Sequence, residues 1–196
     1  MVELNPMIIL VAAIFTNNMI FSNFLGMCSF IAVSKEIPTS LGLGQAVTFV
    51  LGCTAIINYL IYYYILVPLN LEFLRFIIFI VSIAAFVQLL EMILEKYLPN
   101  LYYALGIFLP LITVNCAILG VSLFMIIRNY TFLQSVAFSI GSGIGWTLAI
   151  VALAGIRQRL KLDSIPRGLQ GPGITLIITG LMALAFIGFS GIVQIQ

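Results

Sequence analysis

Three cysteines give this chain its most distinctive chemistry. Cys28 and Cys116 each begin a similar short motif, in which the cysteine is followed by four small or apolar residues and then by Val-Ser. Thiolates are the usual protein ligands of iron–sulfur clusters, and a cluster with four cysteine ligands would need two more thiolates from a second chain. In an apolar segment a cysteine also serves as a small packing residue. Spacing alone leaves both roles open.

The other polar residues inside apolar stretches are weaker candidates for a site. Cys53 has no counterpart elsewhere in the chain, and we interpret it as a packing residue. Glu91 is either a functional intramembrane carboxylate or a side chain that reaches the headgroups, and the sequence favours neither. Asn17, Asn18 and Asn23 have the chemistry to coordinate an ion or to join helices by hydrogen bonds, of which helix association is the more common use.

Glycine-rich stretches resemble phosphate-binding loops only superficially. They lie inside apolar runs without a neighbouring Lys-Ser pair or a strand, so the role we expect of them is close helix packing. The glycines concerned are Gly42, Gly44, Gly141, Gly143 and Gly145.

Several chemistries are excluded by residue types that the sequence lacks. It contains no histidine, which excludes histidine ligation of haem or zinc and histidine proton relays. A nucleophile–base pair and a dinucleotide-binding motif are also absent, so we do not expect catalysis by this chain alone. Its 8 basic and 6 acidic residues are too few to form a surface patch for nucleic acid.

The elements that would position these residues are membrane-spanning helices. The chain is 63% hydrophobic and 7% charged, whereas soluble domains are nearer half apolar and a quarter charged. Long uncharged runs separate the charges, and about 20 apolar residues suffice to span a bilayer as a helix. The first run is too long for a signal peptide, so we expect it in the mature protein. The six predicted spans are Pro6–Val33, Thr39–Val67, Leu71–Tyr97, Tyr102–Ile127, Phe132–Ile156 and Gly173–Ile195.

The orientation of these spans follows from the distribution of basic residues. Most of them lie in the loops after the first, third and fifth spans, and only Arg75 and Arg128 lie on the other side. The positive-inside rule then places both termini outside the cytoplasm. The cluster at 157–167 is interpreted as this topogenic signal rather than as a binding site. The basic residues of the odd-numbered loops are Lys35, Lys96, Arg157, Arg159, Lys161 and Arg167.

The sequence predicts a single all-α membrane domain of six transmembrane helices, arranged as two inverted three-helix repeats at about 1–98 and 99–196. The cysteine pattern lies in the first span of each half, and three spans per half make the second copy enter from the opposite face. Such repeats place functional groups where broken helices meet. Gly26, and Pro110 with Asn115, are the expected breaks. Exposed backbone at a break is tolerated only where protein or a ligand covers it.

Several stretches of the chain match the motifs of a known family. They are Phe-Leu-Gly-Met-Cys at 24–28, Ala-Val-Ser-Lys at 32–35 and Gly-Ile-Phe-Leu-Pro-Leu-Ile-Thr-Val-Asn-Cys-Ala at 106–117. These stretches resemble the D and E subunits of the sodium-translocating NADH:quinone oxidoreductase (Nqr) and the A and E subunits of the Rnf complex. The segments 141–157 and 180–186 look most like the E-type members of Nqr. The likeness covers nearly the whole chain.

The resemblance implies a membrane protein that pairs with the D-type member of Nqr about a pseudo-twofold axis and assembles with the A, B, C and F subunits. In this family each member of the pair gives two cysteines to a [2Fe-2S] cluster in the membrane, and the matching positions are Cys28 and Cys116. Cys53 matches no family motif. Electrons would pass from the cytoplasmic subunit that binds NADH and flavin toward periplasmic flavin and ubiquinone, coupled to sodium export. The chain would lie in the bacterial inner membrane with both termini periplasmic.

Two alternatives remain open. An Rnf A subunit would serve electron transfer between ferredoxin and NAD. A stand-alone secondary transporter would also use inverted repeats and broken helices, but it would work as a homo-oligomer without iron and would tolerate serine at Cys28 and Cys116. The cluster type rests on the resemblance, since two cysteines also suit a single iron with two further ligands from a partner.

Overall fold

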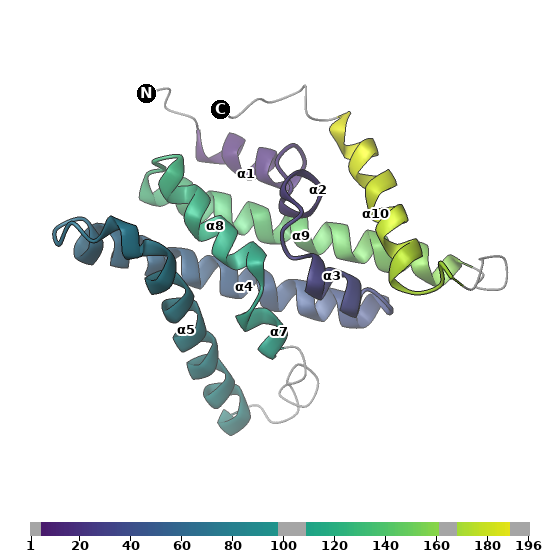
Figure 1. Ribbon diagram of the computed structural model, residues 1–196, viewed down its shortest axis with the longest axis horizontal. Helices are drawn as coiled ribbons and strands as arrows, with labels where there is room; N and C mark the ends of the chain where they lie inside the picture. The colour runs from purple at the N-terminus through teal and green to yellow at the C-terminus, as the bar shows by residue number, and fades with distance from the viewer. Residues whose placement is uncertain (1–4, 98–108, 161–167, 189–196) are drawn as a thin grey trace.

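The structure of the chain, a computed structural model, describes residues 5–97, 109–160 and 168–188. Every regular element among these residues is helical, which confirms the all-α prediction (Figure 1). The beginning of the fourth predicted span and the end of the sixth lie outside the described residues, as do Lys161 and Arg167.

The first predicted span is three short helices rather than one. They are α1 (Pro6–Ile14), α2 (Met19–Asn23) and α3 (Met27–Val33). Between α1 and α2, Asn18 caps the new helix, because its side chain accepts a hydrogen bond from the amide of Ile20. Between α2 and α3, Phe24 and Gly26 have φ values of 55° and 81°, a left-handed conformation that ends a right-handed helix. The break expected at Gly26 is therefore present, and a second one precedes it.

The fourth predicted span is also interrupted within its described part. The two helices there are α7 (Leu109–Thr113) and α8 (Cys116–Ile127). Asn115 caps α8, because its side-chain oxygen accepts a hydrogen bond of 3.1 Å from the amide of Ala117. The break expected at Asn115 is thus present, whereas Pro110 lies inside α7. It stands near the start of that helix, where the missing N–H of proline leaves no helical hydrogen bond unmade.

The remaining helices are long and mostly uninterrupted. They are α4 (Ile37–Ile61) with the π-helical turn η1 (Tyr62–Leu66), the short η2 (Glu72–Leu74) leading into α5 (Arg75–Tyr97), α9 (Phe132–Arg159) and α10 (Pro172–Ile187).

Four helical stretches in the described part of the chain are long and apolar enough to cross a membrane. They are Ile37–Leu66, Glu72–Tyr97, Pro110–Ile127 and Phe132–Arg159, and α10 is a shorter apolar helix. The bounds predicted for the second, third and fifth spans agree with these stretches within three residues. The arrangement of six spans as an inverted repeat stays a prediction.

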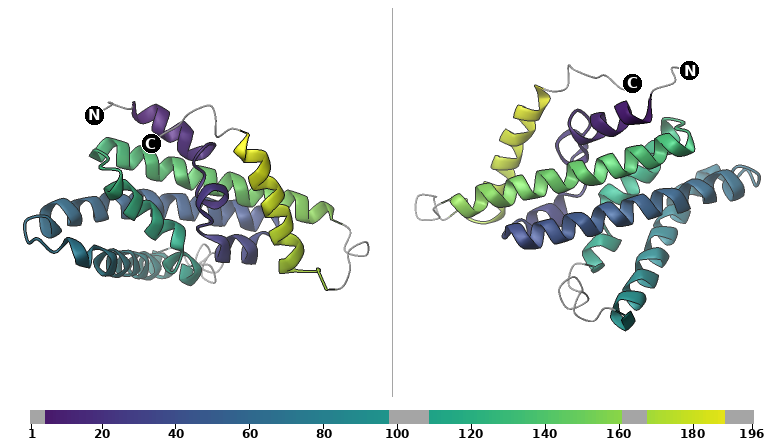
Figure 2. Two further views of the ribbon diagram at one scale, coloured as in Figure 1. Left: turned by 45° about the horizontal axis from the view of Figure 1, so that its top comes forward. Right: turned by 180° about the vertical axis from the view of Figure 1, so that it is seen from behind.

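The antiparallel helices α4 and α9 lie side by side and form the centre of the molecule (Figure 2). Small residues allow this close approach. A Cβ atom on Gly143 would lie 2.8 Å from Cα of Thr48, and one on Gly44 would overlap the side chain of Thr147. The hydroxyls of Thr48 and Thr147 are hydrogen-bonded at 3.2 Å. Close helix packing, the role expected of Gly44 and Gly143, is therefore observed.

The helix α1 packs on α9 in the same way. A Cβ atom on Gly141 would lie 2.7 Å from the carbonyl oxygen of Leu10, and one on Gly145 would lie 3.0 Å from that of Ile14. The amide nitrogen of Asn18 donates a buried hydrogen bond of 2.8 Å to the carbonyl of Gly145, so Asn18 joins helices as expected. The expectation of close packing is wrong within this chain at Gly42, where no atom lies within 4 Å of an added Cβ.

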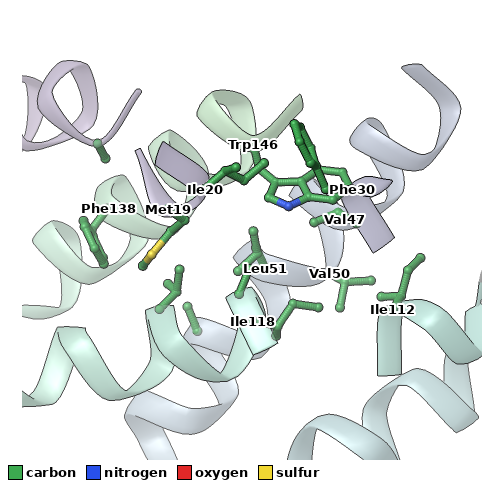
Figure 3. Packing of buried hydrophobic residues seen from close by; sticks show 14 of the residues in the cluster. Met19, Ile20, Phe30, Val47, Val50, Leu51, Ile112, Ile118, Phe138 and Trp146 are labelled. Atoms are coloured by element: carbon green, nitrogen blue, oxygen red, sulfur yellow. The ribbon is translucent and has the colours of Figure 1, made fainter. Parts of the chain in front are cut away.

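Buried apolar side chains fill the space around these helices (Figure 3). The largest fully buried ones include Trp146 and Phe138 from α9, Phe30 from α3 and Phe79 from α5. Trp146 and Phe30 belong to the same buried cluster (Figure 3), and Nε1 of Trp146 lies beside Gly26, so the only tryptophan of the sequence packs near the start of the helix that carries Cys28.

We expect Gly143→Ala to destabilise the chain by about 1–3 kcal/mol, because the added methyl group would push α9 away from the backbone of α4. Gly155→Ala is the matched control on the same helix, since its added Cβ meets no atom within 4 Å and alanine has the higher helix propensity. The measurement is the free energy of unfolding in mixed micelles, followed by the fluorescence of Trp146. Equal effects of the two substitutions would contradict the close packing.

Candidate functional site

The two interrupted segments of the chain meet at the cysteines. The amide of Gly26, in the turn before α3, donates a hydrogen bond of 2.9 Å to Sγ of Cys116, the first residue of α8. The two residues are 90 positions apart in the sequence. Cys28 follows Gly26 in the first turn of α3. The contact therefore brings together the two cysteine-bearing breaks that the sequence predicted.

Only glycine fits the turn at position 26. Its φ of +81° is one that residues with side chains rarely adopt. A Cβ atom there would lie 2.6 Å from Nε1 of Trp146, 3.1 Å from Cβ of Ala117 and 3.2 Å from Oδ1 of Asn115. The lack of a side chain lets the backbone of this turn come close enough to donate to Cys116.

The two cysteines differ in their exposure. Cys116 is half-buried, whereas Cys28 is exposed on the surface of the single chain. Among the described residues, no group of three or more His, Cys, Asp or Glu side chains could hold a metal ion. This part of the chain therefore offers two thiols at the meeting of the breaks, and a site with more ligands would take them from elsewhere.

The helix that carries Cys28 is held by the end of α9. The guanidinium of Arg157 donates hydrogen bonds to the carbonyl of Ile31 at 3.1 Å and to Oγ of Ser34 at 2.7 Å. These acceptors lie at the C-terminal end of α3, where carbonyls have no partner within the helix. At the other end, Oγ of Ser29 donates to the carbonyl of Gly26 at 3.2 Å. From the sequence Arg157 was expected to serve only as a topogenic charge, and its contact with α3 was not predicted.

The remaining candidates form no common site in the described residues. The guanidinium nitrogens of Arg128 lie 2.8 Å from the amide oxygen of Asn17 when that amide is oriented to accept. The amide nitrogen of Asn23 donates to Sδ of Met19 over 3.7 Å. Glu91 is half-buried on α5 and belongs to no metal-binding group there.

Cys53 lines a groove of about 730 Å³ between α4 and α9. The walls of this groove are largely apolar and include Phe49, Ile144 and Leu148. Neither of the other two cysteines lines it. The interpretation of Cys53 as a small packing residue stays a prediction.

Known proteins resemble the chain over almost its whole length. The sequence model of a family described as "Rnf-Nqr subunit, membrane protein" matches residues 7–193. The chain is 55% identical over 194 residues to the E subunit of the Na(+)-translocating NADH-quinone reductase of Psychromonas ingrahamii, with 94% of this chain and 96% of that protein covered. It is 57% identical over 188 residues to the proteins of the same name from Serratia proteamaculans and Pasteurella multocida, with 93% of this chain and 95% of each relative covered.

We expect Arg157→Gln to lower the free energy of unfolding by about 1.5–3 kcal/mol, because a charged donor to two acceptors is lost. Hydrogen exchange of the backbone amides of α3, measured by mass spectrometry, should become faster. Arg159→Gln removes the same charge from an exposed position of the same helical turn and should change neither quantity. If both variants changed stability and hydrogen exchange equally, the effect would come from the loss of a positive charge and not from the loss of the contact with α3.

Proposed function

The chain belongs to the Rnf-Nqr family of membrane subunits, and from that premise we propose that it is the E-type member of a sodium-translocating NADH:quinone reductase. It carries electrons within that complex and is not an enzyme alone. The names of its relatives favour this assignment over an Rnf A subunit. The observation that carries the proposal is the hydrogen bond from Gly26 to Cys116, because it draws the two cysteine-bearing turns together.

Cys28 and Cys116 are, in this proposal, the two thiolate ligands that the chain gives to a [2Fe-2S] cluster shared with the D-type member of the complex. Such a cluster, when bound, supplies one-electron transfer within the membrane. Two thiols in adjacent turns suit half of a four-thiolate set, and the glycine turn leaves room for backbone N–H groups to approach sulfur. The N-terminus of α8 lies at Cys116, where its partial positive charge stabilises an anionic ligand set.

The exposed side of this site suits a second membrane protein. A charged metal centre is costly in lipid unless protein encloses it, and Cys28 is exposed on this chain. The D-type member, with a matching pair of cysteines, would cover that face and complete the ligand set. The thiol of Cys116, which is half-buried and accepts the Gly26 N–H, would be enclosed mainly by this chain.

The order of the helices supports the six-span inverted repeat. Each half begins with an interrupted segment, α1–α3 or α7–α8, and continues with two further helices, α4 and α5 or α9 and α10. Arg128 precedes the start of α9, and Arg157 at its far end reaches Ser34, next to Lys35. Arg128 thus lies at one end of α9, and Arg157 and Lys35 lie near the other end. The positive-inside rule would place the end with Arg157 and Lys35 in the cytoplasm and both termini in the periplasm of a bacterial inner membrane.

The electron path in the proposed complex runs through other proteins on both sides. NADH and flavin are bound by a cytoplasmic subunit, and electrons leave toward periplasmic flavin and ubiquinone, with sodium export coupled to their flow. The A, B, C and F subunits are the further partners, and the D-type member is the direct one.

We expect Cys28→Ser and Cys116→Ser each to remove the same iron and acid-labile sulfide from the purified complex. NADH-to-quinone electron flow should be almost completely lost, because the electron path is interrupted, while NADH oxidation by the flavin subunit with a soluble acceptor continues. Cys53→Ser is the matched control, since this thiol lies in the α4–α9 groove and not at the breaks. It should leave iron content and quinone reduction unchanged.

Survival of iron and quinone reduction in both variants would contradict the proposal. Solute transport by the purified chain without partner proteins, unaffected by serine at either position, would instead favour a stand-alone transporter.

A further inference from the structure

Two buried hydrogen-bond donors beside the cysteine turns have no partner in the described residues. They are Nε1 of Trp146 and Nδ2 of Asn115. The side chain of Trp146 is 0% exposed and that of Asn115 is 2% exposed. An unmatched buried donor costs free energy, and an indole N–H cannot rotate to find another acceptor. Each such group in a folded chain needs an explanation, and an acceptor that belongs to a bound group is one of them.

Both side chains border Gly26. Nε1 of Trp146 lies 2.6 Å from the position that a Cβ atom on Gly26 would occupy, and the oxygen of the Asn115 amide lies 3.2 Å from it. The backbone amide of Gly26 itself donates to Sγ of Cys116. The indole ring lies within the buried core (Figure 3). The indole N–H of Trp146 and the side-chain amide of Asn115 therefore lie around the same turn as a donor that already binds sulfur, and neither of them donates to Sγ of Cys28 or Cys116 in the described residues.

The nearby side-chain amide of Asn18 is a buried N–H donor that does have hydrogen-bond acceptors within the chain. The amide nitrogen of Asn18, which is also buried, donates to the carbonyl of Gly145 at 2.8 Å and to that of Ile14 at 3.1 Å. Gly145 directly precedes Trp146. The other unmatched buried side-chain atoms in the described part of the chain are an acceptor, on Asn58, and two hydroxyls, on Ser135 and Ser142. Trp146 and Asn115 thus hold the unmatched N–H donors.

We propose that Trp146 and Asn115 are positioning residues that donate N–H hydrogen bonds to sulfur at the Cys28–Cys116 site and so raise its reduction potential. The inference rests on the proposed function. A cluster held by these thiolates would carry more negative charge on sulfur in its reduced form, and N–H donors from Trp146 and Asn115 would stabilise that form relative to the oxidised one. Trp146 and Asn115 form and break no covalent bond, and no proton moves. Together with the Gly26 amide they make a set of three donors from α9, α8 and the turn before α3.

The test is a potentiometric titration of the intact complex, followed by the EPR signal that Cys28→Ser removes. We expect Asn115→Asp to shift the midpoint to lower potential, since it keeps the oxygen that caps α8, removes the N–H donor and adds negative charge. Trp146→Phe should lower the midpoint as well and change the g-values, with iron content retained. Phe138→Leu is the matched control, because it reduces a fully buried ring on α9 that carries no N–H group. It should leave both quantities unchanged.

A variant with benzothienylalanine at position 146 keeps the ring volume and replaces only the N–H by sulfur. If Trp146→Phe disturbs folding, the midpoint potential of this variant tests the role of the indole N–H instead. An unchanged midpoint and unchanged g-values in this variant and in Asn115→Asp would overturn the inference while the proposed function stood. Iron retained in both Cys28→Ser and Cys116→Ser would instead overturn the proposed function.

Discussion

A polypeptide that leaves the helical conformation inside a membrane loses its internal hydrogen bonds and must find other partners for its backbone. In this chain the interruption before α3 and the interruption before α8 lie against each other. The amide of Gly26 finds its acceptor in the sulfur of Cys116, and the absence of a side chain at position 26 makes room for that approach. This contact lies between the two cysteines, because each of them is in the first turn of a helix that begins at one of these breaks.

The helix α9 makes several of the contacts that hold the breaks in place. Its glycines bring it against α1 and α4, its tryptophan borders the turn at Gly26, and Arg157 at its end closes α3. The same helix lies along α4 at the centre of the molecule (Figure 2). Helices α1 and α4 of the first half therefore pack on α9 of the second half. The conformation of the cysteine turns depends on this long-range packing.

The features that the sequence predicted are those encoded by local chemistry. Breaks at Gly26 and Asn115 were predictable because left-handed backbone favours glycine and helix starts favour asparagine. The bounds of α4, α5 and α9 followed from the charges that flank them. The contacts of Arg157 and Trp146 with the cysteine turns were not predictable, since they join residues more than 100 positions apart whose register is set by packing. The extra break between α1 and α2 and the place of Pro110 depend on tertiary context in the same way.

The long-range origin of these contacts has a consequence for biogenesis. A chain inserted from its N-terminus produces Gly26 and Cys28 well before Cys116, Trp146 and Arg157. Until those later residues enter the membrane, the turn before α3 has neither its sulfur acceptor nor the cap at the end of α3. If these cysteines hold the metal centre proposed above, its loading would then follow membrane insertion of nearly the whole chain.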